Sequence, residues 1–68
     1  MTVIVRMRGG DRYRLDRRLR QGDVAAKINA ARASGELVEF ETDATPTGQM
    51  VWLDPAEVAA IENERSGW

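Results

Sequence analysis

The chain contains neither cysteine nor histidine. Without cysteine it cannot form disulfides, thiolate metal sites or a cysteine nucleophile, and such a composition is compatible with a reducing cytoplasm. Without histidine it lacks the commonest metal ligand and the commonest general base at neutral pH. The two serines, Ser34 and Ser66, therefore have no histidine to activate them. These absences argue against an enzyme, and we expect no cofactor and no metal.

Long apolar runs are also missing. No stretch approaches the roughly 20 residues that span a bilayer, and the opening segment from Met1 to Val5 is too short for a secretory signal. We therefore expect a cytoplasmic protein with no membrane partner. The 68 residues predict one domain, 1–68, with a short tail at 64–68. A chain this short buries only about 60% of its unfolded surface, so either an efficient small core or oligomerisation must stabilise it.

Charge is distributed unevenly along the chain. Residues 1–34 contain nine basic and three acidic residues, a net charge of +6, whereas residues 35–68 contain eight acidic residues and one arginine, a net charge of −7. The two values sum to −1, so a nearly neutral protein contains two strongly charged segments. This polarity indicates either a basic face for an anionic partner or two segments that neutralise each other in the fold.

The basic half begins with a predicted β-hairpin. Apolar side chains alternate with others from Val3 to Arg8, and Tyr13 and Leu15 continue the alternation on a second strand. A two-residue turn would mix the two faces. A three-residue loop, Gly9 to Asp11, instead places Met7 opposite Tyr13 and gives one apolar face. We expect this second register.

The same register predicts arginine pairs on the outer face. Arg6 falls opposite Arg14 and Arg8 opposite Arg12, and like charges across a ladder destabilise it by ~0.2–1 kcal/mol each. A bound anion such as a phosphate backbone would compensate these charges. The candidate anion-binding or nucleic-acid-binding residues are those of the hairpin and of the connection that follows it: Arg6, Arg8, Arg12, Arg14, Arg17, Arg18 and Arg20.

The other compensation is internal. Val38 and Phe40 alternate with Glu39 and Glu41 in a third predicted strand. Placed beside the first strand, it would set glutamates among the arginines, and exposed opposite charges on neighbouring strands are common. The sequence does not decide whether Glu39 and Glu41 neutralise the arginine face or leave it free.

A helix is expected between the hairpin and the third strand. Gly22-Asp23 provides a break and an N-cap, Val24 and Ile28 recur at helical spacing, and Gly35 suits the position after the C-terminus. Lys27, the only lysine, falls on the outward side. We interpret it as a solvated helix residue, because a catalytic lysine needs burial to lower its pKa.

The last third contains a predicted strand, Met50 to Leu53, after a loop at 42–48. Asp54-Pro55 and Glu57 then form a start that resembles a capping box. Residues 58–62 either continue as a helix, which their alanines favour, or follow a single turn as a short strand. The second arrangement would close a small barrel.

The segment from Val51 to Glu62 resembles the ending of several small bacterial protein families, in which an aliphatic strand is followed by Pro, two residues, Val, two residues and Ile-Glu. These include the FlbD-type flagellar proteins and uncharacterised families with a β-hairpin, a helix and three strands. Asp23 to Ile28 and Gly35 to Val38 are similar to the latter group in order and spacing. The resemblance implies a turn and a strand from Pro55 to Ile61, and it implies no catalytic residue.

Two tryptophans are candidate interface residues. Trp52 alternates with Val51 and Leu53, so it points away from the core if those two point into it. There it would cover the outer sheet face, contact the arginine hairpin by a cation–π interaction, or enter an interface. Trp68 ends the tail and belongs to the residue type most enriched in binding hot spots.

These patterns predict a small α+β domain of order β-β-α-β-β-β. A partly closed barrel with one helix, similar to SH3-like or Sm-like modules, fits this order. The expected function is non-enzymatic protein–protein interaction, as a self-associating regulatory accessory protein of bacterial or phage type. The alternatives are nucleic-acid binding through the arginine-rich hairpin, and capture of a small anionic nucleotide at a subunit interface.

Overall fold

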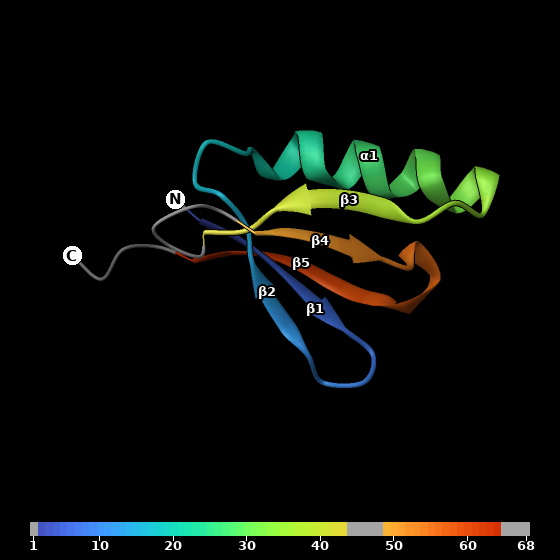
Figure 1. Ribbon diagram of the computed structural model, residues 1–68, viewed down its shortest axis with the longest axis horizontal. Helices are drawn as coiled ribbons and strands as arrows, with labels where there is room; N and C mark the ends of the chain where they lie inside the picture. The colour runs from blue at the N-terminus through green and yellow to red at the C-terminus, as the bar shows by residue number, and fades with distance from the viewer. Residues whose placement is uncertain (1, 44–48, 65–68) are drawn as a thin grey trace.

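The computed structural model describes residues 2–43 and 49–64, which form an α+β domain in the expected order (Figure 1). The elements are β1 (Thr2–Met7), β2 (Arg12–Arg14), α1 (Gln21–Ser34), β3 (Val38–Glu41), β4 (Met50–Leu53), the 3₁₀ turn η1 (Pro55–Glu57) and β5 (Val58–Glu64). Residues 58–62 thus follow a single turn and form a strand. Residues 44–48 of the predicted loop at 42–48 lie outside the described residues, as do residues 65–68 of the predicted tail, which include Trp68. Glu64, predicted to begin the tail, is the last residue of β5.

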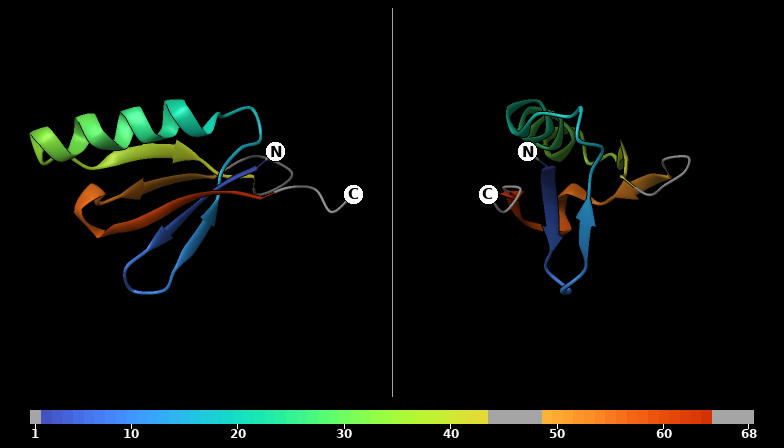
Figure 2. Two further views of the ribbon diagram at one scale, coloured as in Figure 1. Left: turned by 180° about the vertical axis from the view of Figure 1, so that it is seen from behind. Right: turned by 90° about the vertical axis from the view of Figure 1, so that its left-hand side faces the viewer.

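Two antiparallel sheets and one helix enclose the core. One sheet has the order β2-β1-β5 and the other contains β3 and β4. They meet at a corner, where Leu15 bridges Thr42 and the Asp16 N–H donates to the Glu41 carbonyl at 2.9 Å. Helix α1 runs beside β3 and also contacts β5 and η1 (Figures 1 and 2). The prediction that β3 lies beside β1 is wrong, because β1 pairs with β2 and β5.

The core is built from the alternating strand residues and one narrow helix stripe. Val24 and Ile28, one turn apart, are the buried residues of α1, so the helix faces the sheets with a narrow apolar stripe. Leu15, at the corner between the sheets, is fully buried. The buried cluster consists of Val3, Val5, Leu15, Val24, Ile28, Val38, Phe40, Leu53 and Val58.

The hairpin loop lies one residue earlier than expected. The Met7 N–H donates to the Asp11 carbonyl at 2.8 Å, and the Gly10 N–H donates to the Met7 carbonyl at 3.0 Å. The loop is therefore 8–10, with Gly10 at φ +100° supplying the left-handed residue of a three-residue hairpin. Tyr13 consequently pairs with Val5, and the predicted Met7–Tyr13 pair is wrong. The faces are preserved, because the register differs by two residues.

Only the C-terminal end of α1 lies where the sequence predicted it. Gly35 has φ +74° and its N–H donates to the Ala31 carbonyl at 2.8 Å, as a C-terminal glycine should. At the other end the helix begins at Gln21, and Arg20 precedes it without a side-chain cap. Asp23, the predicted N-cap, lies inside the first turn, where its carboxylate faces the positive end of the helix dipole.

Candidate functional site

Two arginines on the outer face of the hairpin, Arg6 and Arg14, contact acidic residues that follow later in the chain. Arg14 contacts two carboxylates, Asp43 at 3.1 Å and Glu64 at 2.8 Å. The hydrogen bond to Asp43, aided by the charge of Glu64, raises the pKa of Arg14. Arg6 lies 4.0 Å from Glu62. Two of these three carboxylates belong to β5, whereas the sequence had suggested Glu39 and Glu41 of β3 as partners.

The observed register of β1 and β2 also changes which arginines stand opposite each other. Arg6 stands opposite Arg12, and Arg14 stands opposite Ile4. The predicted pairs, Arg6 with Arg14 and Arg8 with Arg12, are therefore wrong. One cross-strand arginine pair remains in the described ladder. The repulsion that a bound phosphate would have to compensate is therefore smaller than the sequence suggested.

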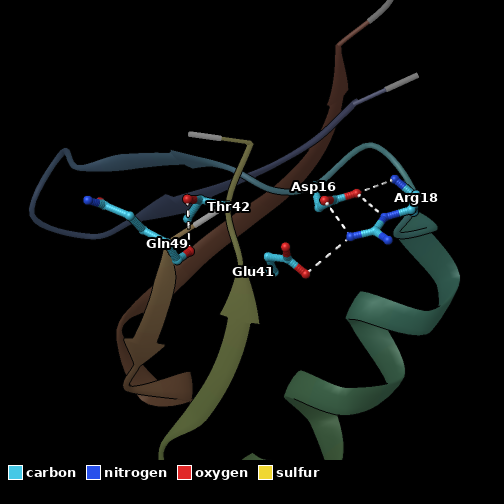
Figure 3. Close-up of polar contacts among 5 residues, drawn as sticks. All are labelled: Asp16, Arg18, Glu41, Thr42 and Gln49. Carbon is cyan, nitrogen blue, oxygen red and sulfur yellow. Dashed lines mark hydrogen bonds and ion pairs between the residues drawn. The ribbon is translucent and has the colours of Figure 1, made fainter. Parts of the chain in front are cut away.

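A second ionic cluster holds the connection between β2 and α1 (Figure 3). The Arg18 guanidinium donates to both oxygens of Asp16 at 3.0 Å and to Glu41 at 3.3 Å, and the Arg18 N–H donates to Asp16 at 2.8 Å. The side-chain hydrogen bond from Arg18 is the main reason why the pKa of Asp16 falls from 3.8 to about 2. Thr42, the residue after Glu41, donates its hydroxyl to the Gln49 carbonyl at 2.9 Å. Arg18 is thus occupied by this chain's own carboxylates.

The remaining candidate arginines lie in two separate places. Arg8 and Arg12 flank the tip of the hairpin, whereas Arg17 and Arg20 lie in the loop before α1, on the opposite side of the molecule (Figure 2). None of the four has an ion-pair partner among residues 2–43 and 49–64. The candidate basic residues therefore do not form one uninterrupted face.

A hollow lies beside Arg17 and Arg20, in the loop before α1. Its volume is about 510 Å³, and Gln21 forms one wall by donating to the Ile61 carbonyl at 3.1 Å and accepting from the Asn63 amide. The other lining residues are Arg17, Arg18, Leu19 and Arg20. Because the Arg18 guanidinium is already bound to carboxylates, the hollow offers an anion fewer free donors than its arginine content suggests.

Apolar side chains gather on the outer face of the β3–β4 sheet. Leu37, Met50 and Trp52 are exposed by 57%, 51% and 61%, and we call these three residues the Trp52 surface. Leu53 is buried and Val51 half-buried, which confirms that Trp52 points away from the core. Met50 and Trp52, two residues apart on β4, share one face of the sheet.

A shallow groove continues this surface toward α1. Its volume is about 320 Å³. Lys27 forms part of its wall and donates to the Glu39 carbonyl at 2.8 Å, with its Nζ 5.0 Å from the centre of the Phe40 ring. Lys27 is exposed, as expected, and it also ties α1 to β3. The lining residues are Lys27, Ala30, Ala31, Ser34, Glu36, Leu37, Val38, Glu39 and Trp52.

Sequence reasoning named Trp52 but missed its two neighbours. The alternation that places Val38 and Phe40 in the core would have assigned Leu37 to the opposite face if it had been extended one residue backward. The same alternation on β4 places Met50 with Trp52. The signal was therefore present in the sequence.

The described residues contain no cluster of three or more side chains that could hold a metal ion, and no helix among them is long and apolar enough to cross a membrane. Comparison of the chain with protein-family models, curated proteins and solved structures found no match.

Proposed function

We propose that this chain is a non-enzymatic protein-interaction domain that associates with a second copy of itself through the Trp52 surface. The observation that carries the proposal is the grouping of Leu37, Met50 and Trp52, each more than half exposed, on one face. Single exposed apolar residues are ordinary, but a group of them is typical of an interaction site. Aromatic residues and methionine are also enriched where proteins meet.

The size of the domain supports the same proposal. A chain of 68 residues gains little stability from its core alone, and association is one of the few remaining stabilisers when cysteine and metal sites are absent from the sequence. Covering Trp52 in a complex would remove its exposed 61% from water. At ~25 cal/mol per Å², a tryptophan side chain of ~250 Å² would then contribute about 4 kcal/mol before the costs of association.

The arginines support nucleic-acid binding less well. Arg6, Arg14 and Arg18 are paired with carboxylates of the same chain, and each pair would have to be broken or shared before a phosphate could bind. In our proposal the basic half serves mainly to neutralise the acidic half. The chain acts as a cytoplasmic accessory or adaptor protein, without catalysis.

The test compares the wild type with Trp52→Ser at micromolar concentration, by light scattering and sedimentation velocity. Arg12→Ser is the matched control, because it changes an exposed strand residue on a different sheet. We expect a dimer for the wild type and for the control, and a folded monomer for Trp52→Ser. The melting temperature should rise with concentration only in the two associating proteins. A monomeric wild type, or unchanged association of Trp52→Ser, would overturn the proposal.

A further inference from the structure

The backbone of β4 is exposed along one edge. The Thr42 N–H donates to the Gln49 carbonyl at 2.8 Å, so these residues form a hydrogen-bonded pair at the end of the β3–β4 ladder. Hydrogen-bonded and non-hydrogen-bonded pairs alternate in an antiparallel ladder. Val51 therefore bonds to β3, whereas the N–H and C=O groups of Met50 and Trp52 point away from it. Within residues 2–43 and 49–64 these outward groups have no hydrogen-bond partner.

The outer edge of β5 is covered by α1. The Gln21 side chain donates to the Ile61 carbonyl at 3.1 Å, and the Arg32 guanidinium donates to the Val58 carbonyl at 3.2 Å. Two side chains of the helix thus occupy carbonyl groups that another strand would need. A second copy could not add a strand to β5 without displacing them.

The outer edge of β3 is covered as well. Lys27 donates to the Glu39 carbonyl at 2.8 Å, and the Asp16 N–H donates to the Glu41 carbonyl at 2.9 Å. These contacts also confirm the alternation, since Glu39 and Glu41 stand opposite Trp52 and Met50 and their carbonyls point away from β4. The remaining edge strand, β2, is three residues long and contains two arginines, and the Asp43 N–H donates to its Arg14 carbonyl at 3.0 Å. In the described part of the chain, β4 is therefore the uncharged strand whose edge is left uncovered.

The composition of β4 fits pairing with another strand. Exposed edges are usually protected by charged residues or proline, and the sequence Met50-Val51-Trp52-Leu53 contains neither. A partner strand that is equally uncharged would bring no unpaired charge to the edge. A second β4 meets this requirement.

Two β4 strands are complementary to each other in one antiparallel register. With Met50 opposite Trp52 of the second copy, all the outward N–H and C=O groups of these residues pair, and Val51 faces its own counterpart. The Met50 sulfur then lies beside an indole ring, a favourable contact. Glu39 of one copy would be separated from Glu41 of the other by three strand spacings, about 14 Å, which exceeds the Debye length of ~8 Å at physiological salt.

We infer that the second copy binds by antiparallel β4–β4 pairing, with Val51 of each copy at the twofold axis. The inference rests on the proposed function, because it specifies how the Trp52 surfaces of two copies come together. The result is a continuous sheet of order β3-β4-β4-β3, in which the side chains of the two Trp52 surfaces form one apolar strip on the outer face.

Single-cysteine variants test this register directly, since the chain has no cysteine of its own. In Val51→Cys the two Cα atoms would lie about 4.5 Å apart, within the usual range for a disulfide. In the matched control Met50→Cys they would be offset by two residues, at about 8 Å, which exceeds the limit of ~7 Å. Under mild oxidation we expect Val51→Cys to form a covalent dimer at least tenfold faster than Met50→Cys, as measured on non-reducing gels. Equal rates, or a faster Met50→Cys, would overturn the register.

A second pair of variants separates the backbone from the side chain. Met50→Pro removes an N–H that β3 does not use, so it should abolish association while the chain stays folded by circular dichroism. Met50→Ala keeps this donor and should remain a dimer with weaker affinity. A dimeric Met50→Pro together with slow Val51→Cys cross-linking would overturn strand pairing, yet the proposed function would stand if Trp52→Ser still abolished association. A monomeric wild type would overturn both.

Discussion

Arg32 provides a quantitative test of how α1 protects β5. Its Nε donates to the Pro55 carbonyl at 3.1 Å and its Nη2 to the Val58 carbonyl at 3.2 Å. The guanidinium thus joins the last turn of the helix to η1 and to the start of β5. Arg32→Met keeps most of the aliphatic stem and the helix propensity, and removes only the two donors.

The expected loss follows from these two hydrogen bonds. A hydrogen bond to a charged group contributes ~1.5–3 kcal/mol net, but these two bonds are only partly buried, so water would replace part of each bond. We therefore expect the free energy of unfolding to fall by about 2 kcal/mol for the pair. For a domain of this size 1 kcal/mol corresponds to ~4–8 °C, so the melting temperature should fall by about 8–16 °C.

The assay is urea and thermal unfolding followed by circular dichroism, at a concentration low enough to suppress association. Arg32→Lys should be intermediate, because an ammonium cannot reach both carbonyls in the fork geometry of a guanidinium. Arg20→Met is the matched control, since Arg20 has no side-chain hydrogen bond in the described part of the chain. A loss below ~0.5 kcal/mol for Arg32→Met, as for an ordinary surface substitution, would refute the structural role.

Two further predictions concern charge. Arg12→Gln should raise the free energy of unfolding by ~0.2–1 kcal/mol, because it relieves the repulsion of Arg6 across the ladder, and the gain should shrink with added salt. Since the pKa of Asp16 falls from 3.8 to about 2 on folding, its pairing with Arg18 stabilises the fold above pH 4 and is lost as the pH drops toward 2. Urea midpoints across this interval should therefore fall less steeply for Asp16→Asn than for the wild type, and parallel curves would contradict the assignment.

Local patterns in the sequence were sufficient for the elements themselves. The alternation of β4 predicted both its bounds and the exposure of Trp52, and Gly35 marked the end of α1 because it alone readily adopts a positive φ there. Asp54 accepts from the Ala56 N–H at 2.9 Å, as its place before Pro55 indicated. Each of these features depends on neighbours within a few residues.

These local patterns could not predict which segments, far apart in the sequence, lie beside each other in the fold. Alternation assigns Val5 to a face but does not say which strand lies beside it, so β5 was not recognised as the neighbour of β1. Likewise, two hairpin registers that differ by two residues bury the same side chains, and only the preference of Gly10 for a positive φ separates them. The partners of Arg14 could not be predicted for the same reason.

The surroundings of Trp52 distinguish the two main functional hypotheses. Proteins that bind single-stranded nucleic acids combine aromatic platforms with a positively charged groove. Here Trp52 stands directly opposite Glu39 on β3, and Met50 stands opposite Glu41. The carboxylate of Glu41 is partly balanced by Arg18, but Glu39 has no ion-pair partner in the described residues. A nucleic acid whose bases stack on Trp52 would therefore bring its phosphates beside the Glu39 carboxylate, whereas an uncharged strand would bring no charge there. In the proposed function the aromatic and the basic residues therefore serve different purposes, and the uncharged β4 edge is the surface proposed for a partner.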